Sequence, residues 1–132
     1  MVDAIKERLS EARNLITRFE RLTFESFQGW AWLRTVKVGQ TLVFDNGATS
    51  TKLTDKPKEM MFEVTVPPGS SFPHHWHDCK EMIIVKEGHL KDKILDYDLR
   101  EGESVFIESK TAHEPYTPDN EQVTMLILLF KL

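Results

Sequence analysis

Short segments in which hydrophobic and polar residues alternate make up most of the chain after residue 29. In the clearest segment, residues 59–66, Met60, Phe62, Val64 and Val66 share one parity, while Glu59, Met61, Glu63 and Thr65 share the other. Such alternation predicts a β-strand with one buried face. By the same criterion, and from flanking turn residues, we expect strands at 30–38, 41–44, 74–77, 81–86, 89–95, 104–107 and 123–132.

Turn signals separate these segments. Asn46-Gly47 is a strong signal for a two-residue hairpin, 55–58 reads as another turn, and Pro67-Pro68-Gly69 ends the strand at 59–66. The last segment, 123–132, is apolar on both faces, which predicts that the helix or a second subunit packs on its outer side. Many short strands at close spacing predict an all-β sandwich or barrel.

The N-terminal segment has a different period. Apolar residues fall at 2, 5, 9, 12, 16 and 19, which is the spacing of one helix face. We therefore predict a helix from Val2 to Phe19, and we divide the chain into an N-terminal helix (1–24) and a barrel domain (25–132). The pattern covers less than three heptads, so packing on the barrel or at a dimer interface is favoured over an independent coiled coil.

Size and charge exclude several classes of function. A chain of 132 residues is the size of one domain. A net charge of −4 argues against binding nucleic acid through phosphate neutralisation.

Cys79 is the only cysteine, so no internal disulfide is possible and a reducing compartment is favoured. The first residues lack the apolar core of a signal peptide and no stretch is long enough to span a bilayer, which predicts a cytoplasmic protein without a membrane partner.

Three of the five histidines lie within four positions, in the run Phe72-Pro-His-His-Trp-His77. In an extended strand only residues two apart point to one side, which pairs His75 with His77 and turns His74 away. A turn at 78–80 would bring Glu81 back alongside His77, and His113 follows another strand. Imidazoles and a carboxylate on one face can hold a divalent metal. The alternative is an exposed loop whose histidines share no target.

The residues around this run resemble the cupin family. Gly69, His75, His77, Glu81 and Gly88 occupy every defining position of the first cupin motif, and the segment from Gly102 to His113 resembles the second motif. The second motif departs from the family pattern in three places: Glu108 and Lys110 stand where a proline and a glycine are usual, and Thr117 stands at a later asparagine position. The two motifs cover about 69–117, and the strand pattern extends the resemblance to about 30–132.

The resemblance implies a cupin-type double-stranded β-helix, a jelly-roll barrel, here carrying one N-terminal α-helix. It also implies that His75, His77, Glu81 and His113 converge on one divalent transition metal ion per chain, whether Fe, Mn, Ni, Zn or Co. Known members include dioxygenases, isomerases, decarboxylases and non-catalytic binders, and many small ones resemble homodimers.

We therefore expect a metal-dependent enzyme of the dioxygenase or isomerase type, which acts on a small polar or carboxylated molecule inside the barrel. No further catalytic residue is assigned. The alternative is a metal-containing module that binds or senses a small ligand without turnover, and a third hypothesis is a structural protein with idle histidines.

Other candidates have more ordinary interpretations. We expect His74 to be a partly exposed neighbour, His89 to be solvated in a turn, and Cys79 to be an ordinary thiol. Tyr116 could line the mouth of the pocket. The final group, Trp30, Trp32 and Arg34, shares one strand parity, and core aromatics with a solvated arginine are favoured over an arginine that clamps a substrate carboxylate.

Overall fold

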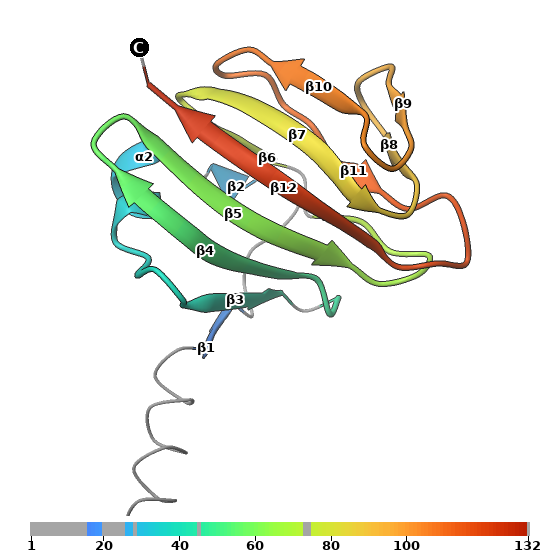
Figure 1. Cartoon of the computed structure of the whole chain (residues 1–132), viewed down its shortest axis with the longest axis horizontal. Helices are drawn as coiled ribbons and strands as arrows, with labels where there is room; N and C mark the ends of the chain where they lie inside the picture. Colours follow the sequence, from blue (N-terminus) through green and yellow to red (C-terminus); the bar gives the residue numbers. More distant parts are fainter. Residues whose placement is uncertain (1–15, 20–25, 28, 45, 73–74, 132) are drawn as a thin grey trace, which may run out of the picture.

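A seven-stranded sheet dominates the computed structural model of the protein, which describes residues 16–19, 26–27, 29–44, 46–72 and 75–131 (Figure 1). Its strands lie in the order β1-β3-β4-β5-β12-β7-β10. Their bounds are Ile16–Phe19 (β1), Thr41–Phe44 (β3), Thr49–Lys56 (β4), Glu59–Val66 (β5), Lys80–Glu87 (β7), Ser104–Ile107 (β10) and Val123–Phe130 (β12). The expectation of an all-β barrel is confirmed.

Two smaller sheets complete the described part of the barrel. The first has the order β11-β8-β9, with Pro115–Tyr116 (β11), Leu90–Asp92 (β8) and Asp98–Leu99 (β9). The second pairs β2 (Ser26–Phe27) with β6 (His75–Trp76) in parallel. Figure 1 shows β8, β9 and β11 beside the β7–β10 end of the large sheet.

The core lies on the inner face of β5, β12 and β7. Phe62 pairs with Ile127, and Ile127 pairs with Ile83, so their buried side chains form a row across three antiparallel strands. Burial alternates along all of β5 and β12. The alternation in the sequence therefore predicted which face of each strand is buried.

The hairpin between β3 and β4 is also confirmed, but Phe44 donates its N–H to Ala48 O at 2.9 Å, so three residues rather than two separate the paired positions. Gly47 has φ +89° and donates its N–H to Phe44 O at 2.9 Å, and the Asn46 side chain accepts from Ala48 N at 3.0 Å. A positive φ is the geometry that favours glycine in such a turn.

The predicted strand at 30–38 is wrong, because Trp30–Arg34 forms the short helix α2. Trp30 and Leu33 are the buried residues of this turn, a helical spacing of three, while Trp32 is exposed. Asp78 accepts the Trp30 N–H at 2.7 Å, which fixes the beginning of the helix. The two tryptophans lie two positions apart, which suggested a strand with both side chains on one buried face. Trp32 faces solvent instead, so this spacing did not reflect the burial pattern.

The predicted N-terminal helix is wrong over its last four residues. Ile16–Phe19 forms β1, which pairs in parallel with β3 and so covers the edge of the large sheet. Residues 2–15 lie outside the described part of the chain, and the boundary at 24/25 stays a prediction. Among the described residues, no helix is long and apolar enough to cross a membrane.

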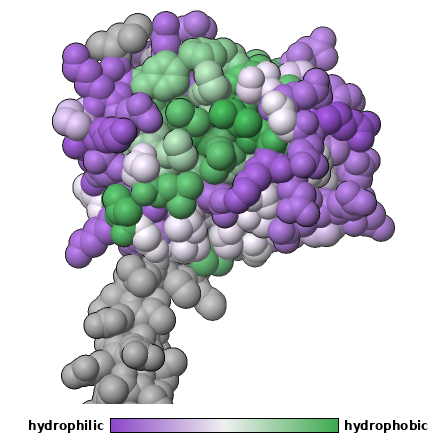
Figure 2. All heavy atoms as spheres, viewed as in Figure 1, coloured by the Kyte–Doolittle hydropathy of each residue, from purple (hydrophilic) through white to green (hydrophobic). Residues whose placement is uncertain are grey.

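The outer face of the large sheet is apolar at its centre. Met61 pairs with Leu128, Leu128 with Met82, and Met82 with Phe106, which gives a continuous row across β5, β12, β7 and β10. Figure 2 shows hydrophobic residues gathered over these central strands. Phe106 is 51% exposed in the single chain, and its ring meets that of Phe130 edge-on at 5.4 Å. The homodimer stays a prediction, and this face is where it would be expected.

Candidate metal centre

Three of the four expected metal ligands come together inside the barrel. His77 follows β6, Glu81 is the second residue of β7, and His113 lies between β10 and β11. They are 4%, 1% and 1% exposed, and one nitrogen or carboxylate oxygen from each lies within 4.8 Å of the others. A buried group of two imidazoles and one carboxylate is a ligand set that can hold a divalent transition metal.

The β7–β10 pairing brings His113 to this site. Glu81 pairs with Ile107 at the end of β10, so the chain leaves the sheet beside Glu81 and needs only a short turn to reach His113. In that turn Lys110 has φ +63° and donates its N–H to His77 O at 2.6 Å. The turn therefore keeps the left-handed backbone that a glycine would favour, although the residue is lysine. Its hydrogen bond ties the His113 segment to the His77 segment.

The orientation of the His113 ring suits a ligand. Its Nδ1 lies 2.9 Å from Thr111 O, and its Nε2 lies 2.7 Å from Glu81 Oε2. A ring that donates its Nδ1–H to a backbone carbonyl carries its lone pair on Nε2 when neutral, and metal-binding histidines are commonly held in this way. His77 Nε2 lies 3.7 Å from the other Glu81 oxygen, Oε1, so the carboxylate stands between the two rings.

The carboxylate also controls the charge of His113. Burial would lower the pKa of His113, but the charge of Glu81 and the hydrogen bonds to Glu81 and Thr111 raise it to about 9. Without a metal, His113 is therefore an imidazolium paired with Glu81 at neutral pH. A metal ion must displace that proton before it can bind to Nε2.

The structure describes only the backbone of the fourth expected ligand, His75. His75 lies in β6, where its backbone pairs with Ser26, one residue before Trp76 and two before His77. Its side chain is not described, and His74 lies outside the described residues. His75 as a ligand stays a prediction.

A small cavity lies beside two of the three residues, His77 and Glu81. It has a volume of about 20 Å³, room for about one or two water molecules. His77 and Glu81 form part of its wall, together with Leu33, Leu42, Phe44, Ser50, Phe62, Val64, Phe72, Ile127 and Leu129. The candidate metal centre therefore adjoins a mostly apolar space that is lined chiefly by the large sheet.

Asp92, which the sequence did not single out, supports the segment of His113. The buried Asp92 accepts from Glu114 N and from the Tyr97 hydroxyl, both at 3.0 Å, and thereby holds the backbone next to His113. Its other oxygen accepts from the N–H groups of residues 94 and 95. In the sequence, Asp92 is simply an aspartate before a loop, and this feature is too common in proteins to predict a supporting contact.

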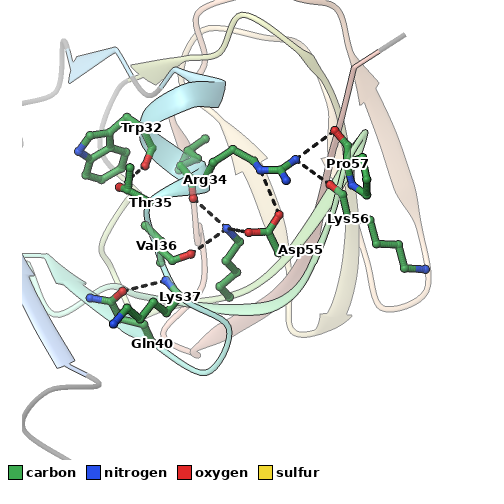
Figure 3. A network of polar contacts seen from close by, with 11 residues as sticks. Trp32, Arg34, Thr35, Val36, Lys37, Gln40, Asp55, Lys56 and Pro57 are labelled. Atoms are coloured by element: carbon green, nitrogen blue, oxygen red, sulfur yellow. Dashed lines mark hydrogen bonds and ion pairs between the residues drawn. The ribbon is translucent and has the colours of Figure 1, made fainter.

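A second buried cluster lies around Lys52, which is fully buried on the inward face of β4. Its ammonium group donates to Leu33 O at 2.9 Å, to Val36 O at 2.8 Å and to Asp55 Oδ2 at 2.8 Å. Figure 3 shows the ion pair of Asp55 with Arg34 and the bonds from Arg34 to the carbonyls of Lys56 and Pro57. Arg34 is thus engaged by the protein, which argues against the substrate clamp considered for it.

The expectation for His89 is wrong. His89 is 8% exposed, and its ring lies between Asp98, on its Nε2, and Asp119, at 3.0 Å from its Nδ1. A ring flanked by two carboxylates holds the chain segments together rather than lying in solvent.

Cys79 and Tyr116 are the remaining candidates. Burial, with Asp78 and Glu81 nearby, raises the pKa of Cys79 to about 12, so it is an inert thiol as expected. Tyr116 lies in β11, with Lys93 Nζ 5.9 Å from its ring centre, and is not among the described residues of the cavity wall.

Comparison with known proteins supports the resemblance seen in the motifs. A family described as a cupin domain matches residues 62–129, which is more than half of the chain. No curated protein matches the sequence significantly.

Solved structures share the fold. A cupin domain from Bordetella pertussis aligns with a TM-score of 0.58 at 20% identity, over 65% of this chain and 95% of that one. A predicted oxalate decarboxylase from Thermotoga maritima aligns with a TM-score of 0.57 at 22% identity, over 64% and 81%. A polyketide cyclase from Streptomyces resistomycificus aligns with a TM-score of 0.55 at 25% identity, over 63% and 64%.

Proposed function

The chain belongs to the cupin family, and on that basis we propose that it is a metal-dependent cupin that acts on a small molecule held inside the barrel. The proposed ligands of the ion are His77, Glu81 and His113, with His75 as the fourth. Because cupins carry out many reactions, the family alone does not select one.

One observation carries the proposal: the buried His113 ring is oriented by Thr111 O so that its Nε2 faces Glu81, in a group that also includes His77. The ligand atoms of all three lie within 4.8 Å of one another, a spacing from which they can close around one ion. A bound divalent ion would supply Lewis-acid polarisation of a substrate oxygen or, as iron, a site for substrate and O₂.

The protein residues around the ion have separate tasks in this proposal. Glu81 balances part of the charge of the ion, and Thr111 and Asp92 hold His113 in place. The apolar wall of the cavity excludes water, which strengthens electrostatic effects at the ion. A dioxygenase or isomerase reaction is the enzymatic form of the proposal.

A second candidate function is a module that binds a small ligand without turnover. It is favoured by the composition of the cavity wall, because the described wall residues other than His77 and Glu81 include no further acid or base. Incubation of the iron-loaded protein with candidate substrates, with O₂ consumption and product formation as readouts, distinguishes the two functions.

Metal binding is tested with Glu81→Gln, which keeps the shape of the side chain and removes its charge. Wild-type protein equilibrated with Fe, Mn, Ni, Co or Zn should retain about one ion per chain after gel filtration and show a raised melting temperature. Glu81→Gln should retain much less. A full equivalent of ion in Glu81→Gln, or no uptake by the wild type, would refute the proposal.

A further inference from the structure

The side chains that line the cavity limit which kinds of ligand can bind there. We propose that the molecule bound beside the ion is compact and apolar, and that its only negative charge lies on the atoms that touch the ion. This inference rests on the proposed metal-binding function. It differs from the sequence-based expectation of a polar or carboxylated molecule.

The side chains of the cavity wall favour an apolar ligand body. Eight of the eleven described wall residues carry aliphatic or aromatic side chains, and Ser50 supplies the one hydroxyl among them. A ligand body in this space gives up its hydration and gains contacts with carbon atoms. An apolar group gains free energy from this exchange, whereas a charged group loses it unless an opposite charge is nearby.

Lys52 is a buried cation behind the cavity wall. Lys52 follows Ser50 by two residues on β4, so both point inward, and its Nζ lies 5.9 Å from the ring centre of the wall residue Phe62. An ammonium group has three donors. All three are directed at protein oxygens, on Leu33, Val36 and Asp55. Lys52 therefore has no donor left for a ligand carboxylate or phosphate.

The net charge at the ion limits the charge that a ligand can carry. The described wall contains one carboxylate, Glu81, and no lysine or arginine. A divalent ion bound to a single carboxylate keeps one net positive charge. That charge can balance a monoanionic donor, such as a hydroxamate or an enolate, but a dianion would leave excess negative charge in a site of low dielectric.

The size of the cavity limits the ligand body. A volume of about 20 Å³ is far less than a large substrate needs. The edge-to-face pair of Phe44 and Phe72, with ring centres 4.8 Å apart, contributes two of the wall side chains. A short branched alkyl group is therefore a better fit than an extended or multiply substituted molecule.

The inference is tested with three probes that bind metals through two oxygens in a five-membered chelate ring. Acetohydroxamate and isobutyrohydroxamate differ only in the size of their alkyl group, and oxalate carries a second negative charge instead. Binding to the cobalt-loaded protein is followed by the visible spectrum of the ion, and metal content is measured in every sample.

Isobutyrohydroxamate should bind at least about threefold more tightly than acetohydroxamate, because the added methyl groups are buried against the wall. Oxalate should form no complex with the loaded protein at concentrations that leave the ion in place. Equal affinity of the two hydroxamates, or an oxalate complex tighter than both, would overturn the inference and leave metal binding intact. Failure to take up cobalt at all would overturn the proposed function, and this inference with it.

Matched variants on β5 locate the binding site. Val64 lies on the cavity wall, whereas Val66 is fully buried on the same face of the strand but outside the described wall. Val64→Thr keeps the shape of the side chain and adds a hydroxyl to the wall, so it should weaken isobutyrohydroxamate binding about three- to tenfold. Val66→Thr should leave the affinity unchanged in folded, cobalt-loaded protein. Equal effects of the two variants would place the ligand elsewhere and contradict the inference.

Discussion

Among the described residues, the buried charged clusters around Lys52 and around Glu81 differ in the direction of their donors and acceptors. Around Lys52 each donor is directed at a protein oxygen, so the cluster is complete in itself. Around Glu81 the imidazole nitrogens and the carboxylate oxygens converge on a common region, as metal ligands do. The first arrangement holds helix α2 against the sheet, and the second is suited to an ion.

The comparison also explains why burial alone does not identify a site. Lys52 is as buried as Glu81, yet its surroundings assign it a structural role. A buried ionisable group indicates a ligand site when its partners are themselves ligand residues and a cavity adjoins them. Both conditions hold for Glu81.

The largest effect is expected for loss of a metal ligand. His113→Gln keeps a polar side chain but removes the imidazole nitrogen, so the affinity for the ion should fall by more than about 100-fold. His89→Gln is the matched control, because His89 is also buried but is held by Asp98 and Asp119. Titration with Co²⁺ or Ni²⁺ measures both. Equal losses in the two variants would contradict the assignment of His113.

The second-largest effect is expected on stability, when the ammonium group of Lys52 is removed. Lys52→Met leaves the carbonyls of Leu33 and Val36 without their donor, so the free energy of unfolding should fall by about 3 kcal/mol. The folded fraction should still take up metal. Urea unfolding measures the loss.

The control for Lys52→Met is Lys86→Met, which removes an exposed lysine that pairs with Glu63 at 3.0 Å. Its effect should be under about 1 kcal/mol. If Lys52→Met lost its metal while still folded, the separation of the two clusters would be wrong.

The pH dependence of the metal-free protein gives the third test. The pKa of His113 is raised to about 9, above the ordinary value near 6.5, so the folded state binds this proton more tightly than the unfolded state does. The stabilisation is complete below pH 6.5 and is lost as the pH rises through about 9. It amounts to at most about 3 kcal/mol.

Urea unfolding at pH 6 and at pH 9.5, with chelator present, measures this difference. The same titration on His113→Gln should lack the His113 contribution. Metal affinity should rise over the same range, because hydroxide removes the competing proton. A metal-free wild type whose pH dependence matched that of His113→Gln would show that the pair with Glu81 is not charged.

The smallest effect concerns the turn that joins the two ligand segments. Lys110 has φ +63°, a conformation that glycine adopts with less strain, so Lys110→Gly should raise the free energy of unfolding by up to about 1 kcal/mol. Lys110→Ala keeps the strained backbone and serves as the control. If the glycine variant were the less stable of the two, the turn would not be strained.

The sequence predicted most of the strands at least in part, but it missed β4, β9, β11 and the elements that precede β3. The strands β3, β5 and β10 were predicted with the bounds that they have, because each combines alternation with clear turn residues on both sides. The helix α2 was missed because one tryptophan of its short turn is exposed, and five residues do not establish a period. For Ile16–Phe19 the helical spacing competed with pairing along the edge strand β3, and the pairing prevailed.

For the candidate site, the sequence predicted which residues meet but not what surrounds them. Strand parity and the cupin motifs pointed to His77, Glu81 and His113, and the fold brings these three together. Neither the carbonyl that orients His113 nor Asp92 could be predicted, because both contacts depend on how separate loops lie against each other. His89 was misjudged for the same reason, since its two carboxylate partners are 9 and 30 residues away.

The sequence by itself determined the spacing of the ligands and the alternation of the strands, because both are local properties of an extended backbone. Only the tertiary structure decided that Lys52 turns its charge toward α2 and that apolar side chains form the wall beside Glu81. These features arise from contacts between segments far apart in the chain. The burial of each charge, and with it the pKa of His113, depends on the whole barrel rather than on any one strand.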